Sequence, residues 1–304
     1  MKAFVSRKVF LRNAALLFAG SAWLRFPPKK RISLSFSTLG CPEWSFSEIT
    51  SFAVRHGYQG IEFRGLREQM DITKASAFAN EQAVTASLDE LKRKGLCVVN
   101  LGSSASMHEP EPGKRQQNLD EARSYIRLAA RLNCPFIRVF PNTLPAGSER
   151  QAALGRIVDG LRELSATALN HGVKILMETH GDLVKSDEIA AVMEALDPAQ
   201  AGLVWDVANM WTITGEDPAT VYKKLKPYIF HTHIKDAVTT GSQLIYTLPG
   251  KGNVPVFEAI RLLEAGGYRG YYSFEWEKRW HPELAGPATA LAEYPLIMRE
   301  MFDE

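Results

Sequence analysis

Short runs of apolar and β-branched residues alternate with longer stretches of helical spacing from Arg31 to the end of the chain. The runs have the length and composition of buried strands, and the longer stretches repeat apolar residues every three to four positions, as in Leu161, Leu164 and Ala168. The pattern predicts strands at Ile32–Leu39, Gly60–Arg64, Cys97–Gly102, Phe136–Pro141, Val173–Thr179, Gly202–Val207, Ile229–Ile234 and Tyr271–Trp276. It predicts helices at Ser47–His56, Ala83–Lys94, Arg115–Leu132, Glu149–His171, Ser186–Leu196, Pro218–Leu225, Val256–Ala265 and Pro287–Met301.

Eight strand–helix units in this order indicate an α/β protein with a parallel sheet. We predict a single (β/α)₈ TIM barrel that occupies residues 31–304 as one catalytic domain. An open, doubly wound sheet is the alternative. It is disfavoured because no glycine-rich phosphate-binding motif follows the first strand. No linker, charge block or low-complexity segment divides this region.

Each predicted strand from the fifth to the eighth ends in an acidic or imidazole side chain. Glu178 ends the fifth strand, Asp206 the sixth, His233 the seventh and Glu275 the eighth. In a barrel, the carboxyl ends of the strands meet at the face where active sites are built. Three carboxylates placed together would repel one another, and buried charges need partners. A shared divalent cation is the simplest explanation.

The donor types limit the identity of this cation. Three carboxylates and one imidazole suit Mn²⁺, Mg²⁺, Co²⁺ or Zn²⁺, and we take Mn²⁺ as the first choice. The three cysteines, Cys41, Cys97 and Cys134, form no CxxC pair, so a thiolate-bound structural zinc is not indicated. We interpret all three as small buried hydrophobic residues.

Five segments resemble the xylose isomerase-like sugar phosphate isomerase/epimerase superfamily, which also contains endonuclease IV-type enzymes. They are Gly60–Arg64, Glu178–His180, Trp205–Asn209, His231–Asp236 and Tyr272–Glu275, and the resemblance extends over nearly everything from Arg31 onward. It implies that Glu178, Asp206, His233 and Glu275 hold one metal. It further implies that Glu178 and Glu275 exchange a proton with a substrate carbon.

The resemblance therefore implies a metal-dependent isomerase or epimerase that acts on a sugar or keto-sugar. The metal would polarise a carbonyl, a carboxylate would remove the proton next to it, and the resulting enediolate would be stabilised by the metal. An inosose dehydratase-like lyase is the alternative, because it begins with the same proton abstraction. A non-catalytic sugar-binding barrel is a third hypothesis. It is disfavoured because both glutamates are present.

The chain departs from two branches of this superfamily. The ketose 3-epimerases usually have a histidine where this chain has Asn209, and they tend to have an arginine beyond the seventh strand, where this chain has Lys235 and Asp236. The endonuclease branch has an Asp-x-His pair that is missing here, which favours a single metal and no nucleic-acid substrate. The expected partners are a small-molecule substrate and, as an open alternative, a second copy of the chain.

Further polar and aromatic residues near the predicted strand ends are candidates for substrate binding. His180 could instead orient a metal ligand, His231 could be a buried structural histidine, and Lys235 could pair with an acid. Glu62 and Arg64 could form a structural ion pair with each other, and His108 could lie in a solvated loop. The candidate set is His180, Asn209, His231, Lys235, Glu62, Arg64, Trp44 and His108.

The N-terminus resembles an export signal. Residues 1–26 contain Arg7, Lys8 and Arg12, then the apolar run Ala14–Ala19, then small residues that end at Ala22. The basic cluster resembles a twin-arginine motif in which Lys8 replaces the second arginine. We therefore expect a leader that is cleaved near Ala22 and a periplasmic or exported protein. The alternative is a leader that stays attached to a cytoplasmic protein. The net charge of +2 gives no nucleic-acid signature.

Overall fold

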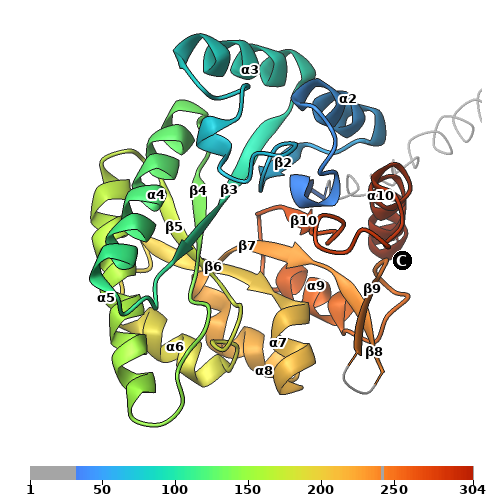
Figure 1. Cartoon of the computed structure of the whole chain (residues 1–304). Coiled ribbons are helices and arrows are strands. Elements are labelled where there is room, and N and C mark those ends of the chain that lie inside the picture. The colour runs from blue at the N-terminus through green and yellow to red at the C-terminus, as the bar shows by residue number, and fades with distance from the viewer. Residues whose placement is uncertain (1–31, 241–242, 304) are drawn as a thin grey trace, which may run out of the picture. The chain divides into compact units, whose positions relative to one another are not determined.

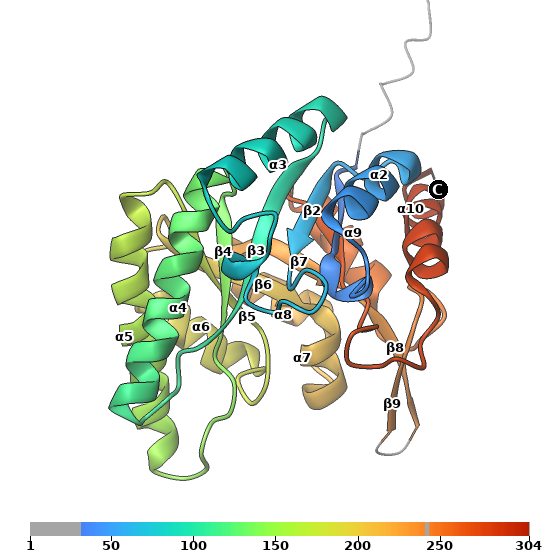
Figure 2. The same ribbon diagram turned by 45° about the horizontal axis from the view of Figure 1, so that its top comes forward.

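The computed structural model describes residues 32–240 and 243–303. Eight parallel strands close into a barrel in the order β1-β10-β7-β6-β5-β4-β3-β2, and helices surround it (Figures 1 and 2). The strands are β1 (Leu34–Ser37), β2 (Gly60–Phe63), β3 (Cys97–Ser106), β4 (Phe136–Phe140), β5 (Lys174–Glu178), β6 (Ala201–Asp206), β7 (Ile229–Ile234) and β10 (Tyr272–Phe274). The predicted TIM-barrel fold is confirmed, and all eight strands lie where the sequence predicts them.

The helices follow the strands in the expected alternation. They are α2 (Phe46–His56), α3 (Glu81–Lys94), α4 (Pro112–Arg131), α5 (Glu149–Leu169), α6 (Ser186–Glu194), α7 (Val207–Thr214), α8 (Pro218–Leu225), α9 (Val256–Ala265) and α10 (Pro287–Asp303). Three short 3₁₀ turns, η1 (Thr38–Gly40), η2 (Ile72–Lys74) and η3 (Lys226–Tyr228), complete the connections. Helix α7 begins directly after β6, with Asp206 as its N-cap, and the sequence did not predict it.

Local signals explain where these helices start and stop. Ser45 and Glu48 form a reciprocal capping box at the start of α2, which satisfies backbone N–H groups that the helix leaves free. The helix ends at Gly57, whose φ of 78° lies in the left-handed region that glycine adopts at little cost. The chain then turns directly into β2. Each βα unit thereby starts its strand at the amino end of the barrel and delivers the residues after it to the carboxyl end.

A two-stranded antiparallel hairpin interrupts the alternation after β7. Its strands are β8 (Asp236–Thr240) and β9 (Gln243–Thr247), and it lies in the connection between β7 and α9 (Figure 1). Asp236 anchors its base by accepting hydrogen bonds from the backbone N–H groups of Gly250, Gly252 and Val254. No strand was predicted here from the sequence. The hairpin matters because Tyr246 of β9 lines the cavity described below.

The three cysteines and the expected leader were also predicted from the sequence. Cys41 and Cys134 are buried as predicted, but the prediction for Cys97 is wrong. Its thiol is exposed at the amino end of β3, where Sγ lies 3.0 Å from the Tyr271 hydroxyl. The expected leader at residues 1–26 lies outside the described residues. Within residues 32–240 and 243–303, no helix has the length and apolar character needed to cross a bilayer.

Candidate metal centre

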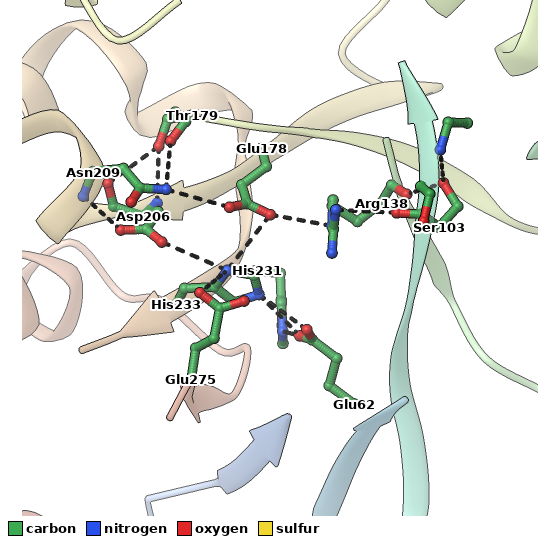
Figure 3. A network of polar contacts seen from close by, with 12 residues as sticks. Glu62, Ser103, Arg138, Glu178, Thr179, Asp206, Asn209, His231, His233 and Glu275 are labelled. Atoms are coloured by element: carbon green, nitrogen blue, oxygen red, sulfur yellow. Dashed lines mark hydrogen bonds and ion pairs between the residues drawn. The ribbon is translucent and has the colours of Figure 1, made fainter. Parts of the chain in front are cut away.

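Four side chains from four strands meet at the carboxyl end of the barrel (Figure 3). Glu178 is the last residue of β5, Asp206 is the last residue of β6, His233 lies in β7, and Glu275 follows β10. In the parallel register, Asp206 lies beside His233, which lies beside Ser273 of β10. The register therefore brings four side chains from distant parts of the sequence to one depth of the barrel, and all four are buried.

The ligand atoms of these side chains face one another. His233 Nδ1 lies 3.3 Å from Glu275 Oε2, 3.7 Å from Glu178 Oε2 and 3.8 Å from Asp206 Oδ2. One ligand atom from each residue lies within 4.8 Å of all the others. His233 Nδ1, Glu178 Oε2 and Asp206 Oδ2 are buried but make no hydrogen bond. The two oxygens have ion-pair contacts instead, Glu178 Oε2 with Arg138 and Asp206 Oδ2 with Lys235, and buried polar atoms without a hydrogen bond are rare. Three that surround one point fit a bound divalent cation, as does a donor set of carboxylates and imidazole.

The far side of the His233 ring is held by Glu62 of β2. Its carboxylate lies 3.1 Å from His233 Nε2 through both oxygens, and 2.7 Å from His231 Nε2 (Figure 3). Burial raises the pKa of Glu62, but His233 and His231 outweigh burial and lower it. Because Glu62 is ionised, Nε2 of His233 must donate to it. In a neutral ring, Nδ1 then presents its lone pair to the three carboxylates, as metal binding requires.

Glu62 therefore does not pair with Arg64, and the ion pair considered from the sequence is wrong. Strand alternation places both side chains on the inner face of the barrel. The carboxylate reaches across the barrel to two histidines of β7 instead. No described carboxylate lies within ion-pair distance of the Arg64 guanidinium.

Two buried cations balance the carboxylates. Arg138 of β4 places Nε 3.1 Å from Glu178 Oε2. Burial raises the pKa of Glu178, but Arg138 and His233 lower it to about 2. Burial likewise raises the pKa of Glu275, but His233 and Lys235 bring it well below its usual value. Both glutamates are therefore ionised at neutral pH, as a ligand or a base must be.

Lys235 is the second buried cation, and it contacts carboxylate oxygens of the candidate metal centre directly. Its ammonium lies 2.8 Å from Asp206 Oδ2, 2.7 Å from Glu275 Oε2 and 2.8 Å from Glu277 Oε1. Burial lowers the pKa of Lys235, but these three carboxylates raise it well above its usual value. The pairing with an acid that the sequence left open is present, with three acids rather than one.

The pKa of His233 is set by the same opposition between burial and neighbouring carboxylates. Burial lowers the pKa of its imidazole, but Glu275, Glu62 and Glu178 outweigh burial and raise it well above its usual value. The centre therefore attracts positive charge strongly, whether a proton or a metal ion supplies it.

A small cavity of about 240 Å³ opens onto this centre. Its walls come from loops and strand ends all around the carboxyl face of the barrel. The lining residues are Leu39, Arg64, Arg138, Phe140, Glu178, His180, Asn209, Lys235, Tyr246, Glu275, Glu277, Trp280 and His281. The structure therefore brings His180, Asn209, Lys235 and Arg64, four of the expected substrate-binding residues, to the same cavity as both glutamates.

The other expected residues lie elsewhere. Trp44 packs its ring 4.7 Å from that of Phe52 and lines an outer groove, so it does not wall the cavity as expected. His108 is not a lining residue, and its backbone oxygen accepts a hydrogen bond from Arg156 Nε. Glu62 and His231 lie behind the centre, where they orient one another and His233. For His231, the alternative of a buried structural histidine is the one that the structure matches.

Several lining residues were missed in the sequence analysis. Arg138 lies in the middle of β4, between apolar residues, and is 1% exposed. A charged residue inside a buried strand is a signal in itself, because its charge needs a partner. Glu277, two residues beyond Glu275, could have been found by the same alternation. Tyr246 could not, because its position depends on the hairpin.

The fold and this arrangement define a class of proteins, the (β/α)₈-barrel enzymes with a functional site at the carboxyl ends of the strands. Residues 51–299 match the family described as xylose isomerase-like TIM barrel, and the chain belongs to that family.

Individual relatives within the family differ in activity. An inosose dehydratase of Bacillus anthracis (strain CDC 684 / NRRL 3495) is 30% identical over 169 residues, which cover 49% of this chain and 53% of the relative. The chain thus spans about half the length of the curated relatives it matches. The structure of the IOLI protein with a bound zinc atom is 17% identical, with a TM-score of 0.74, and the match covers 90% of this chain and 98% of the other.

A third similar protein is an L-ribulose 3-epimerase. Its structure is 15% identical, with a TM-score of 0.72, and the match covers 90% of this chain and 95% of the other. At these identities the two structures show the shared barrel. The similar proteins therefore include both a sugar epimerase and a dehydratase.

Proposed function

We propose that this protein is a metal-dependent isomerase or epimerase that moves a proton next to the carbonyl of a sugar or keto-sugar. Glu178, Asp206, His233 and Glu275 would hold one divalent ion, with Mn²⁺ the first choice. The observation that carries the proposal is the convergence of one imidazole and three carboxylate ligand atoms, all buried and all within 4.8 Å of one another. When bound there, a divalent ion supplies a Lewis acid for a substrate carbonyl oxygen.

The two glutamates supply the proton chemistry. Glu178 and Glu275 reach the centre from β5 and from the end of β10, and both line the cavity. One carboxylate accepts the proton from the carbon next to the carbonyl, and the electron pair of the broken C–H bond remains on the substrate as an enolate. The other carboxylate, or the same one, returns a proton to carbon or oxygen. Two carboxylates allow return on either side, which is what epimerisation needs.

Dehydration is the second candidate, and Lys235 favours it. Its ammonium lies at the cavity wall between Glu275 and Glu277 and is placed to interact with a hydroxyl that leaves after the proton is removed. The similarity to an inosose dehydratase supports the same alternative.

Deuterium exchange tests the common step and separates the two outcomes. The Mn²⁺-loaded protein would be incubated with ketoses and with a keto-inositol in D₂O and followed by NMR and mass spectrometry. We expect deuterium at the carbon next to the carbonyl, together with a new isomer or epimer of unchanged formula. A product lighter by one water would instead establish the dehydratase. If no compound in the panel exchanges a proton, the proposal loses its support.

Glu62 gives a prediction that does not depend on turnover. In Glu62→Gln, the amide can no longer bind both histidines as a carboxylate does, so the His233 ring loses its fixed orientation. We expect affinity for Mn²⁺ to fall by about 10- to 100-fold, as measured by isothermal titration. Glu81→Gln, in an exposed ion pair with Arg131, is the matched control. Equal affinities in the two variants would show that Glu62 has no part in holding the ion.

A further inference from the structure

Arg64 is a buried cation that has no carboxylate in direct contact among the described residues. It follows β2, lines the cavity and is 8% exposed. Among the described residues, no carboxylate forms an ion pair with it, and its Nη1 is buried without a hydrogen-bond partner. Burying an unpaired charge is strongly unfavourable, so such groups are normally paired. A guanidinium kept in this state beside a substrate cavity calls for an anion that the chain itself does not provide.

The carboxylates nearby are already committed. Glu178 pairs with Arg138, Glu62 binds His231 and His233, and Glu275 and Glu277 share Lys235. Burial and the guanidinium of Arg138 lower the pKa of Arg64 to about 10, which still leaves it charged at neutral pH. Arg64 therefore keeps its positive charge although burial and Arg138 disfavour that charge.

The fold makes room for this guanidinium. A side chain at Gly102 of β3 would place its Cβ 2.8 Å from Arg64 Cδ and 2.8 Å from Arg138 Nη2. Because glycine stands there, both arginines fit side by side. The Phe140 ring packs against them, with its centroid 3.7 Å from Arg138 Cζ and 5.9 Å from Arg64 Cζ. Arg64 is thus held at the cavity wall by packing rather than by an ionic partner.

We propose that Arg64 binds an anionic group of the substrate, so that the substrate is a hydroxylated carbonyl compound with a carboxylate or a phosphate ester. The planar fork of a guanidinium binds either anion through two parallel hydrogen bonds. A bound divalent ion would add positive charge to the cavity and strengthen this preference. The inference rests on the proposed function, since it names the substrate class of the same site. It specifies an acidic substrate in place of a neutral sugar.

Binding measurements with matched ligands test the proposal. D-Fructose, D-fructuronate and D-fructose 6-phosphate share a 2-keto group and differ in whether C6 carries a hydroxyl, a carboxylate or a phosphate. We expect at least one of the two acids to bind the Mn²⁺-loaded protein at least about tenfold tighter than fructose, as measured by isothermal titration. The preferred acid distinguishes the carboxylate from the phosphate.

Substitution of Arg64 tests whether this residue causes the preference for an acid over fructose. In Arg64→Met, the affinity for the preferred acid should fall about 100-fold while that for fructose stays within about twofold. Arg64→Lys, which keeps the charge but not the fork, should lie in between, and Arg162→Met, which removes an exposed arginine, should match wild type. Without ligand, Arg64→Met should melt no lower than wild type, because it removes an unpaired buried charge.

Three results would overturn the inference. They are acids that bind no tighter than fructose, an Arg64→Met variant that weakens all three ligands equally, and a ligand-free variant that melts far below wild type. These outcomes stay separate from a failure of the proposed function, because equilibrium binding needs no turnover. A protein that prefers an acid through Arg64 but exchanges no proton in D₂O would contradict the function alone.

Discussion

Glu178→Gln is expected to lower the rate of proton exchange in D₂O by about 1,000-fold. The amide keeps the shape of the side chain and one oxygen that can face the metal, but it cannot accept a proton. The variant should also remain folded, because Glu178 lies at the end of β5. Its partner Arg138 also keeps its hydrogen bond to the backbone oxygen of Ser103. Exchange would be measured by NMR at saturating ligand.

Metal content must be measured in the same samples, because Glu178 is both a proposed ligand and a proposed base. If Glu178→Gln binds a full equivalent of Mn²⁺ and still exchanges protons at nearly the wild-type rate, Glu178 is not the base. A variant that is inactive only because it is metal-free should recover when Mn²⁺ is raised. One that lacks the base should stay inactive.

Lys235→Met is expected to destabilise the metal-free protein by about 3–5 kcal/mol. The ammonium lies within 3 Å of Asp206 Oδ2 and Glu275 Oε2 and balances their charge. Its loss leaves the buried carboxylates facing one another. A bound divalent ion would supply the missing charge to the same oxygens. We therefore expect saturating Mn²⁺ to stabilise this variant more than it stabilises wild type, as measured by urea unfolding with and without the ion.

Lys224→Met is the matched control for this comparison. Lys224 pairs with the largely exposed Asp187, and an exposed ion pair contributes about 1 kcal/mol or less. Metal-free Lys235→Met that unfolds at the same urea concentration as this control would show that the ammonium does not balance the acids. Equal stabilisation of wild type and Lys235→Met by Mn²⁺ would show that the ion and the ammonium do not share ligands.

The sequence was informative about the barrel because its signals are local. Strand ends such as Glu178 and Asp206 follow apolar runs directly, and in a barrel the ends of consecutive strands must be neighbours. That rule predicts that the four residues of the candidate metal centre lie together, near the cavity residues His180, Asn209 and Lys235.

The remaining features depend on contacts across the barrel. Alternation shows that Glu62 and Arg64 point inward, but not that Glu62 reaches the histidines of β7, which is three strands away from β2 around the barrel. Arg138 pairs with a residue on the next strand, and its role becomes visible only with the register of β4 and β5. The hairpin β8–β9 carries Tyr246 to the cavity through antiparallel pairing, and the sequence pattern of alternating strands and helices does not predict that pairing.

The most direct test of the account is the position of a bound metal. Crystals grown with excess Mn²⁺ would be measured for anomalous scattering from manganese. We predict one peak per chain, enclosed by Glu178, Asp206, His233 and Glu275, with the Lys235 ammonium moved toward Glu277. A centre without a peak at saturating Mn²⁺, or an ion bound away from these four side chains, would contradict the account.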